Sequence, residues 1–265
     1  GKGARMSGLD RTRRALLALT LLGAFAAGCS APSSKPAAEA LKSPATVDEV
    51  VAANLMARGG IERLHALRAI RETGKVTASD GRVALVVREI QRPGLFRLEF
   101  TYQGTTSIFA HDGTSGWQIA PLQGQFEPLV MPPETDTAGG VDQRDIEGPL
   151  VDWREKGHVV TLAGREAIDG KDAFRLEVNL KGGLTRYDYV DVASHLVVRS
   201  DVTRIIRGHA TVLENRFSDF RDEGGIVFPH AIESHVKDRP QILRIVVDKI
   251  ELDPVLDPAR FKMPG

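Results

Sequence analysis

The sequence predicts an α+β domain that is mainly β: a curved antiparallel sheet forming an incomplete, half-open β-barrel of about 10–11 strands, with short helices covering the open side. Two observations support this prediction. From about Ile70 onward, segments of alternating apolar and polar residues follow one another, separated by turn signals such as Ser79-Asp80-Gly81 and Asp169-Gly170. Before Ile70, apolar residues recur at helical spacing.

The domain is expected to begin with a helix. Thr46-Val-Asp-Glu49 is a capping box, in which the Thr and Glu side chains satisfy free backbone N–H groups at a helix start. Apolar residues then recur on one helical face, and Gly59-Gly60 is a stop signal. A shorter helix is predicted from Ile61 to Leu67.

The strand prediction is clearest in Phe96-Arg-Leu-Glu-Phe100 and in the segment from Phe174 to Leu180, where apolar and charged residues alternate strictly. Twelve segments have strand character, and we expect one or two of them not to be strands. They are 70–79, 82–91, 95–103, 105–111, 116–120, 158–166, 172–181, 184–192, 195–206, 209–220, 226–237 and 241–252. A single sheet of this size has to curl strongly or close on itself.

Two segments interrupt this series of strands. Residues 121–133 contain four prolines and are predicted to be a loop, and residues 134–156 are predicted to contain short helices, one of them starting at Pro149. Helices on the open side of a curled sheet would enclose an apolar cavity.

The N-terminal region has the features of a bacterial lipoprotein export signal. Arg11, Arg13 and Arg14 precede a short apolar stretch that ends in Ala26-Ala27-Gly28-Cys29, which resembles a lipobox. The stretch is shorter than the roughly 20 residues that a membrane-spanning helix needs. We therefore expect Cys29 to be lipidated; the alternative is an ordinary secretory signal cleaved after Ala27 or Gly28.

Three regions follow from this interpretation. Residues 1–28 are the signal peptide, with Met6 as the expected start and residues 1–5 outside the native chain. Residues 29–45 are small, polar and proline-rich, as in a flexible tether, and residues 46–265 form one domain. Because Ser30 rather than Asp follows the cysteine, resemblance to the enterobacterial sorting rule favours the periplasmic face of the outer membrane.

Composition excludes several classes of protein. Thirty-five basic and 35 acidic residues give no net charge, and the basic residues are dispersed, which argues against a nucleic-acid partner. Since Cys29 is the only cysteine, the domain has no internal disulfide.

Signatures of an enzyme are weak. The seven histidines include no HExxH motif, and Ser115 in Gly113-Thr-Ser-Gly116 has no identifiable base. We therefore predict a non-enzymatic protein with no metal site and no cofactor.

Several motifs in this order resemble the LolA/LolB-like superfamily of outer-membrane lipoprotein-sorting proteins. They are Phe96-Arg-Leu-Glu-Phe100, His111-Asp-Gly-Thr-Ser-Gly-Trp117, Gly148-Pro-Leu-Val-Asp-Trp153, Phe217-Ser-Asp-Phe220, Val227-Phe-Pro-His230 and Leu256-Asp-Pro-Ala-Arg-Phe-Lys-Met-Pro264. The resemblance implies an incomplete barrel whose apolar cavity takes the acyl chains of lipids or lipoproteins, as in a membrane-anchored receptor or carrier. The alternative is a sensing or regulatory interaction protein on the same fold, and a hydrolase is a third, weaker hypothesis. Neither the ligand nor a protein partner follows from the sequence.

Large apolar residues are the candidates for the cavity and its lid, although ordinary core packing is the alternative for each strand residue. The candidates are Phe96, Leu98, Phe100, Trp117, Phe126, Leu129, Met131, Leu150, Trp153, Phe174, Leu176, Tyr187, Tyr189 and Phe228.

Overall fold

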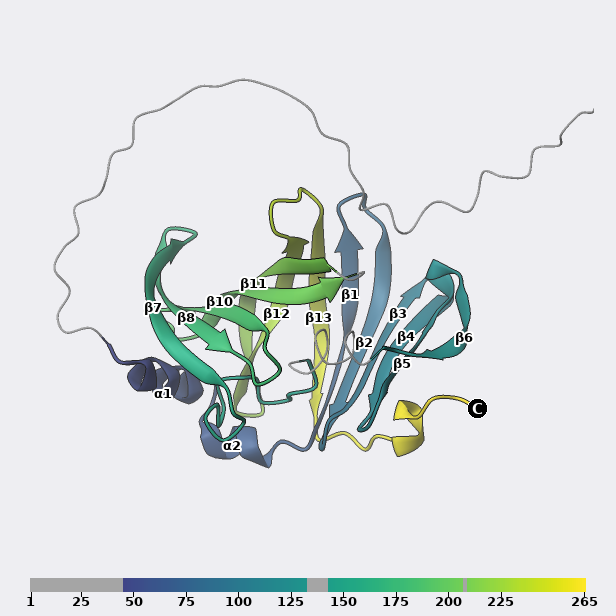
Figure 1. Ribbon diagram of the computed structural model, residues 1–265, viewed down its shortest axis with the longest axis horizontal. Coiled ribbons are helices and arrows are strands. Elements are labelled where there is room, and N and C mark those ends of the chain that lie inside the picture. Colours follow the sequence, from purple (N-terminus) through teal and green to yellow (C-terminus); the bar gives the residue numbers. More distant parts are fainter. Residues whose placement is uncertain (1–44, 133–142, 207–208) are drawn as a thin grey trace, which may run out of the picture. The chain divides into compact units, whose positions relative to one another are not determined.

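One antiparallel sheet dominates the computed structural model of the protein, which describes residues 45–132, 143–206 and 209–265 (Figure 1). The described residues form 13 strands: β1 (Ala69–Ala78), β2 (Val83–Gln91), β3 (Leu95–Tyr102), β4 (Thr105–Asp112), β5 (Gly116–Ala120), β6 (Gln125–Val130), β7 (Val159–Ile168), β8 (Lys171–Asn179), β9 (Thr185–Asp191), β10 (Val197–Ile206), β11 (His209–Glu223), β12 (Ile226–Val236) and β13 (Ile242–Leu252). The sheet is curved and unclosed, so the predicted fold class, a mainly β incomplete barrel with short helices, is confirmed.

The strand order explains why the sheet stays open. It runs β6-β5-β4-β3-β2-β1-β13-β12-β11-β10-β9-β8-β7, so the first and the last strand pair with each other in the middle. Strands β6 and β7, which follow each other in the chain, therefore lie at the two opposite edges. The segment that connects them has to travel from one edge of the sheet to the other.

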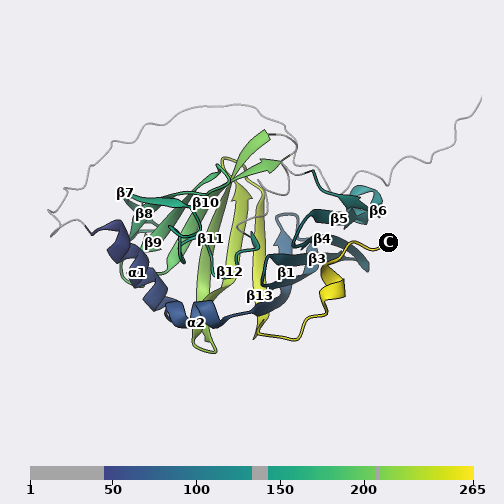
Figure 2. The ribbon, with the colours of Figure 1, turned by 60° about the horizontal axis from the view of Figure 1, so that its bottom comes forward.

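The helices lie where the sequence predicts them. Helix α1 (Val47–Ala57) starts with the expected capping box: Thr46 Oγ1 accepts a hydrogen bond from the Glu49 N–H at 3.2 Å, and Glu49 accepts one from the Thr46 N–H at 2.7 Å. Helix α2 (Ile61–Ala66) follows directly. Helix α1 packs across the side of the sheet formed by β7, β8 and β9 (Figure 2).

Two glycines, Gly59 and Gly225, allow α1 to approach the sheet closely. The backbone of Gly59, at φ +116°, lies against the β11–β12 turn, and a Cβ at this position would be 2.0 Å from the carbonyl oxygen of Gly225. Next to this contact the N–H of Val227 donates to the carbonyl of Arg58 at 3.0 Å. The stop signal of α1 is therefore also its docking point on β12.

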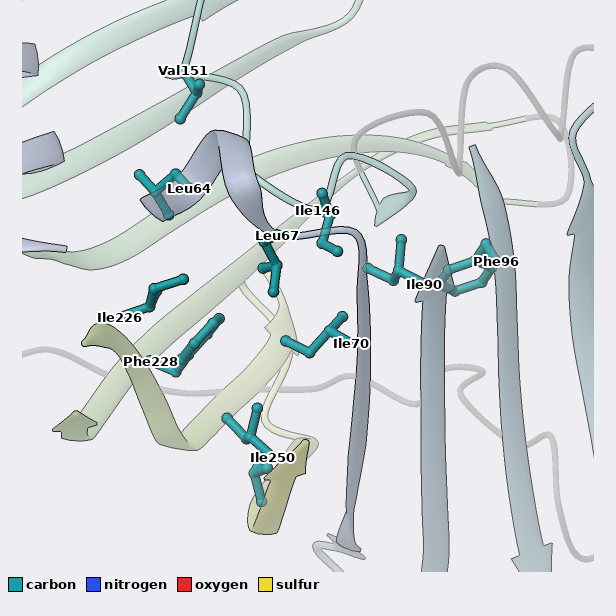
Figure 3. Close-up of a cluster of buried hydrophobic side chains, with 11 residues drawn as sticks. Leu64, Leu67, Ile70, Ile90, Phe96, Ile146, Val151, Ile226, Phe228 and Ile250 are labelled. Atoms are coloured by element: carbon teal, nitrogen blue, oxygen red, sulfur yellow. The ribbon is translucent and has the colours of Figure 1, made fainter. Parts of the chain in front are cut away.

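The main core lies between the sheet, the helices and the connecting segment. One cluster joins Leu64 and Leu67 to Ile70, Ile90 and other residues of β1, β2, β3, β12 and β13, with Ile146 and Val151 of the connecting segment on top (Figure 3). A second cluster packs Val50 and Val51 of α1 against β7, β8 and β9. The described part of the segment between the sheet edges thus covers one face of the sheet.

The C-terminal segment covers part of the opposite face of the sheet. The 3₁₀ helix η3 (Pro258–Phe261) places Phe261 in a cluster with Ala69 and Leu256, and the Nε1–H of Trp117 donates to the Phe261 carbonyl at 2.7 Å. Beside it Arg260 forms ion pairs with Glu89 and Glu99 at 3.0 and 3.1 Å. The end of the chain is therefore integrated into the fold.

Three details of the sequence prediction need correction. All twelve predicted segments are strands, and β6 adds one within the predicted loop 121–133, which also contains the 3₁₀ helix η1 (Pro121–Gln123). A strand containing Pro128 is tolerated because β6 is an edge strand. Residues 149–157 form consecutive turns instead of a helix starting at Pro149.

Some predictions fall outside the described residues. They concern the signal peptide 1–28, Cys29, the tether up to Pro44 and the part of the predicted helical segment at 134–142. Among the residues that the structure does describe, no helix has both the length and the apolar character needed to cross a bilayer.

Replacing Gly59 by Ala should lower the free energy of unfolding by about 3 kcal/mol or more, because the backbone of Gly225 has to move away. Gly124→Ala is the control: its φ is also positive, at +85°, in the left-handed helical region, but a Cβ there meets nothing within 4 Å, so it should cost about 1 kcal/mol. Urea unfolding followed by circular dichroism measures both. Equal losses would contradict the close approach at Gly59.

Phe261→Ala should destabilise the protein by about 3 kcal/mol, because this side chain is 1% exposed and seals the cluster over Trp117. Met263→Ala, at a position that is 42% exposed, should change stability by less than about 0.5 kcal/mol. Thermal unfolding combined with tryptophan fluorescence tests the pair. An equally small effect of both substitutions would show that the C-terminal segment does not stabilise the sheet.

Candidate functional site

The two faces of the sheet have different surroundings. We call the face covered by α1, α2 and residues 145–151 the inner face, and the face covered by η3 the outer face. Ile70 and Ile90 point to the inner face. Because side chains alternate along a strand, Glu72, two residues after Ile70, and Arg88, two residues before Ile90, point to the same face.

A cavity of about 280 Å³ lies on the inner face. Most of its lining side chains are apolar. They come from β1, β2, the start of β10, β11, β12, β13 and the connecting segment: Ile70, Ile90, Ile146, Leu150, Leu196, Val197, Phe217, Phe220, Val227, Phe228, Ile232 and Val247. This volume is just below the usual range for ligand pockets, roughly 300–1,000 Å³.

The apolar surface of the inner face continues along the strands beyond Ile70 and Ile90. Paired residues form a row across five strands, all of them half-buried: Ala84, Val76, Ile245, Ile232 and Phe217. Next to it Val86 pairs with Phe100, whose ring meets that of Phe109 edge to face at 6.3 Å between centroids. The cavity is thus one part of a longer apolar surface.

The structure brings some of the predicted site residues together. Leu150 and Phe228 line the cavity. Phe96, Leu98 and Phe100 lie on the inner face of β3, because they pair with Ile90, Arg88 and Val86. On β8, Phe174 and Leu176 belong to the cluster below α1, and Trp153 packs against the same cluster.

Three predicted cavity residues lie on the outer face, which corrects their assignment. Trp117 packs under η3. In β9, Arg186 and Asp188 line the cavity, so Tyr187 and Tyr189 point to the other side, where the guanidinium groups of Arg175 and Arg199 cover their rings at 4.2 and 4.7 Å. Burial, with a contribution from Asp201, raises the pKa of Tyr189 to about 12.

The remaining three candidates lie at the edge of the sheet. Phe126 and Leu129 belong to β6 and are 70% and 47% exposed, and Met131 directly follows this strand. A role for them in ligand binding stays a prediction.

Polar groups at the cavity are the main feature that the sequence prediction missed. Arg186 forms an ion pair with Asp188 at 2.6 Å, and Arg88 forms one with Glu72 at 2.7 Å. Arg58, at the end of α1, donates to the carbonyl of Glu147 at 2.7 Å. Burial lowers the pKa of Arg58, and the negative charges of Asp145, Glu147 and Asp188 partly offset this effect. The expected apolar cavity therefore has a charged side.

Ion pairs also hold the connecting segment in place. Glu147 pairs with Arg92 of the β2–β3 turn, and Lys156 bridges Asp145 and Glu147 at 2.7 and 3.3 Å. Glu147 is buried, so these pairs fix the segment at the rim of the cavity.

His230 is buried, and both of its ring nitrogens lie close to oxygen atoms of the protein. A ring nitrogen of His230, Nδ1, is 2.8 Å from the carbonyl oxygen of Val247, and its Nε2 is 3.0 Å from a carboxylate oxygen of Glu223. Within the described ranges, no three His, Cys, Asp or Glu side chains gather closely enough to hold a metal ion.

Comparison with known proteins gives matches in structure alone. No protein-family model and no curated protein matches the sequence. A DUF1329 family protein from Desulfovibrio piger matches with a TM-score of 0.55 and 14% identity, over 82% of this chain and 97% of that protein.

Two further structures are similar to a comparable degree. A domain from Vibrio parahaemolyticus that is assigned to outer membrane lipoprotein sorting has a TM-score of 0.53 and 12% identity, over 80% of this chain and 94% of that domain. A LolA superfamily protein from Nitrosomonas europaea has a TM-score of 0.53 and 14% identity, over 83% of this chain and 98% of that protein. The curved open sheet, the short helices at its inner face and these three matches together show that this chain shares the fold of these three proteins, one of which is a LolA superfamily protein.

Proposed function

We propose that this protein binds acyl chains of lipids or lipoproteins on the inner face of its sheet, and that a lipidated Cys29 anchors it at the periplasmic face of the bacterial outer membrane. Binding on this face is non-covalent and requires no cofactor. The lipoprotein-sorting assignment of the structurally similar Vibrio domain supports this proposal.

The single observation that carries the proposal is the continuity of the cavity with the apolar row on the inner face. The cavity reaches Ile232 and Phe217, and the same two residues end the row that starts at Ala84. An extended chain of methylenes fits such an elongated surface better than a compact polar molecule does. Each methylene buried there contributes about 0.8 kcal/mol, so a long acyl chain has enough apolar surface for tight binding.

Purified full-length protein carrying Cys29→Ala should bind a fluorescent fatty acid and should co-purify with lipid detectable by native mass spectrometry. Val86→Asn, on the inner face, should weaken binding about tenfold, because a polar amide replaces apolar surface beside Phe100. Leu85→Asn is the matched control: this neighbouring side chain points to the outer face and is 54% exposed, so binding should stay unchanged. Equal losses in the two variants, with unchanged circular dichroism, would argue against the inner face, and absence of lipid and of fatty-acid binding would refute the proposed function.

The anchoring part of the proposal has its own test. In a bacterial host, the unchanged protein should be found with the membrane fraction, and Cys29→Ala should release it into the soluble fraction, because stable anchoring requires the acyl chains on this cysteine. Labelling with radioactive palmitate should follow the same pattern. A Cys29→Ala protein that remains membrane-bound shows that the lipobox interpretation is wrong.

A further inference from the structure

Arg58 is a cavity-lining cation whose charge is not neutralised by a direct ion pair. Its guanidinium donates one hydrogen bond, to the backbone carbonyl of Glu147, and within the part of the chain that the structure describes no carboxylate is close enough to pair with it. A guanidinium has five N–H donors, so four of them have no hydrogen-bond partner among the described residues.

The carboxylates nearest to Arg58 are already committed to other cations. Asp188 pairs with Arg186, Asp145 with Lys156, and Glu147 with Arg92 and Lys156. The cavity lining itself has three cations, Arg58, Arg88 and Arg186, and three carboxylates, Glu72, Asp145 and Asp188. When the residues that pair with the connecting segment, Arg92, Lys156 and Glu147, are added, the described group has five cations against four carboxylates. One positive charge is in excess, and it belongs to Arg58.

Asn54 provides a second, independent observation beside Arg58. It lies four residues earlier on α1, hence on the same helical face, and it also lines the cavity. Its Nδ2 donates to the His195 carbonyl at 2.8 Å, which fixes the orientation of the amide. Its Oδ1 is buried and has no hydrogen-bond partner among the described residues. Since buried acceptors are normally satisfied, this oxygen is suited to a donor group of a ligand that displaces the surrounding wall.

We infer that the ligand is an anionic phospholipid with a hydroxyl-bearing head group, of the phosphoglycerol class, whose phosphate binds Arg58 and whose hydroxyl donates to Asn54 while its acyl chain lies on the apolar inner face. This inference rests on the proposed function and specifies its substrate. Arginine suits a phosphate because its planar donors match the phosphate oxygens in pairs. A buried phosphate also needs a compensating cation, and the excess charge of Arg58 supplies it.

The test compares ligands that share one acyl chain and differ in charge. Isothermal titration of the full chain carrying Cys29→Ala would use oleoyl lysophosphatidylglycerol, monooleoylglycerol and glycerol phosphate, each lipid below its micelle concentration. We expect lysophosphatidylglycerol to bind about tenfold more tightly than the uncharged monooleoylglycerol, and glycerol phosphate, which has no acyl chain, to bind far more weakly than either lipid.

Variants of Arg58 separate charge from cavity shape. Arg58→Gln should abolish the preference by weakening lysophosphatidylglycerol alone, and Arg58→Lys, which keeps the charge but loses the planar pair of donors, should retain part of it. Arg244→Gln removes the same charge from an exposed position that pairs with Glu233, so it should leave the preference intact. The unchanged affinity for monooleoylglycerol in Arg58→Gln also serves as evidence that the variant is folded.

The alternative outcomes have distinct meanings. Equal affinities for the two lipids in the parent protein would reject the anionic ligand and leave the proposed lipid binding standing. Parallel weakening of both lipids by Arg58→Gln would show that Arg58 shapes the wall instead of recognising charge. Glycerol phosphate binding as tightly as lysophosphatidylglycerol would identify a site for free phosphate esters. Absence of binding for both lipids would reject the proposed function itself.

Discussion

The pairing of the first strand with the last is the constraint on which the rest of this structure depends. Because β1 and β13 meet in the middle of the sheet, the two series of strands extend outward from them, and β6 and β7 lie at opposite edges. The connecting segment therefore has to pass from edge to edge, and its described part packs Ile146 and Val151 on the inner face. A sheet that closed on itself would not need this cover.

The two faces of the sheet differ in the surroundings of their charged side chains. On the outer face, arginine and carboxylate side chains form networks beside exposed surface, for example Arg199 with Asp201 and Glu214 at 2.8 and 3.0 Å. On the inner face, the charged groups are few and lie among apolar side chains. Charges in such surroundings require partners, and the Arg186–Asp188 and Arg88–Glu72 pairs provide them. Arg58 departs from this pattern, which is why it is informative about a ligand.

Sequence reasoning located the elements well and the site residues only in part. The strands and the two helices were predictable because alternation, capping and turn residues are local signals. Strand β6 was missed because Pro128 interrupts its alternation, which an edge strand tolerates. The sequence prediction assigned Tyr187 and Tyr189 to the cavity because alternating aromatic residues of a strand usually point toward the core. Here arginines stack on their rings at the outer face, while Arg186 and Asp188 pair on the inner face.

The amino-acid sequence by itself determined most of the secondary structure and the mainly β fold class, since both follow from contacts between residues close in the chain or from the period of a strand. Only the tertiary structure decided which face of each strand is the inner one and which charges remain in excess there. Asn54 and Arg58 are polar residues in and at the end of a helix, with no local signal that distinguishes them. Both residues reach the cavity because Gly59 lets α1 dock on β12. Arg58 has no direct ion pair because the nearby carboxylates pair with other cations.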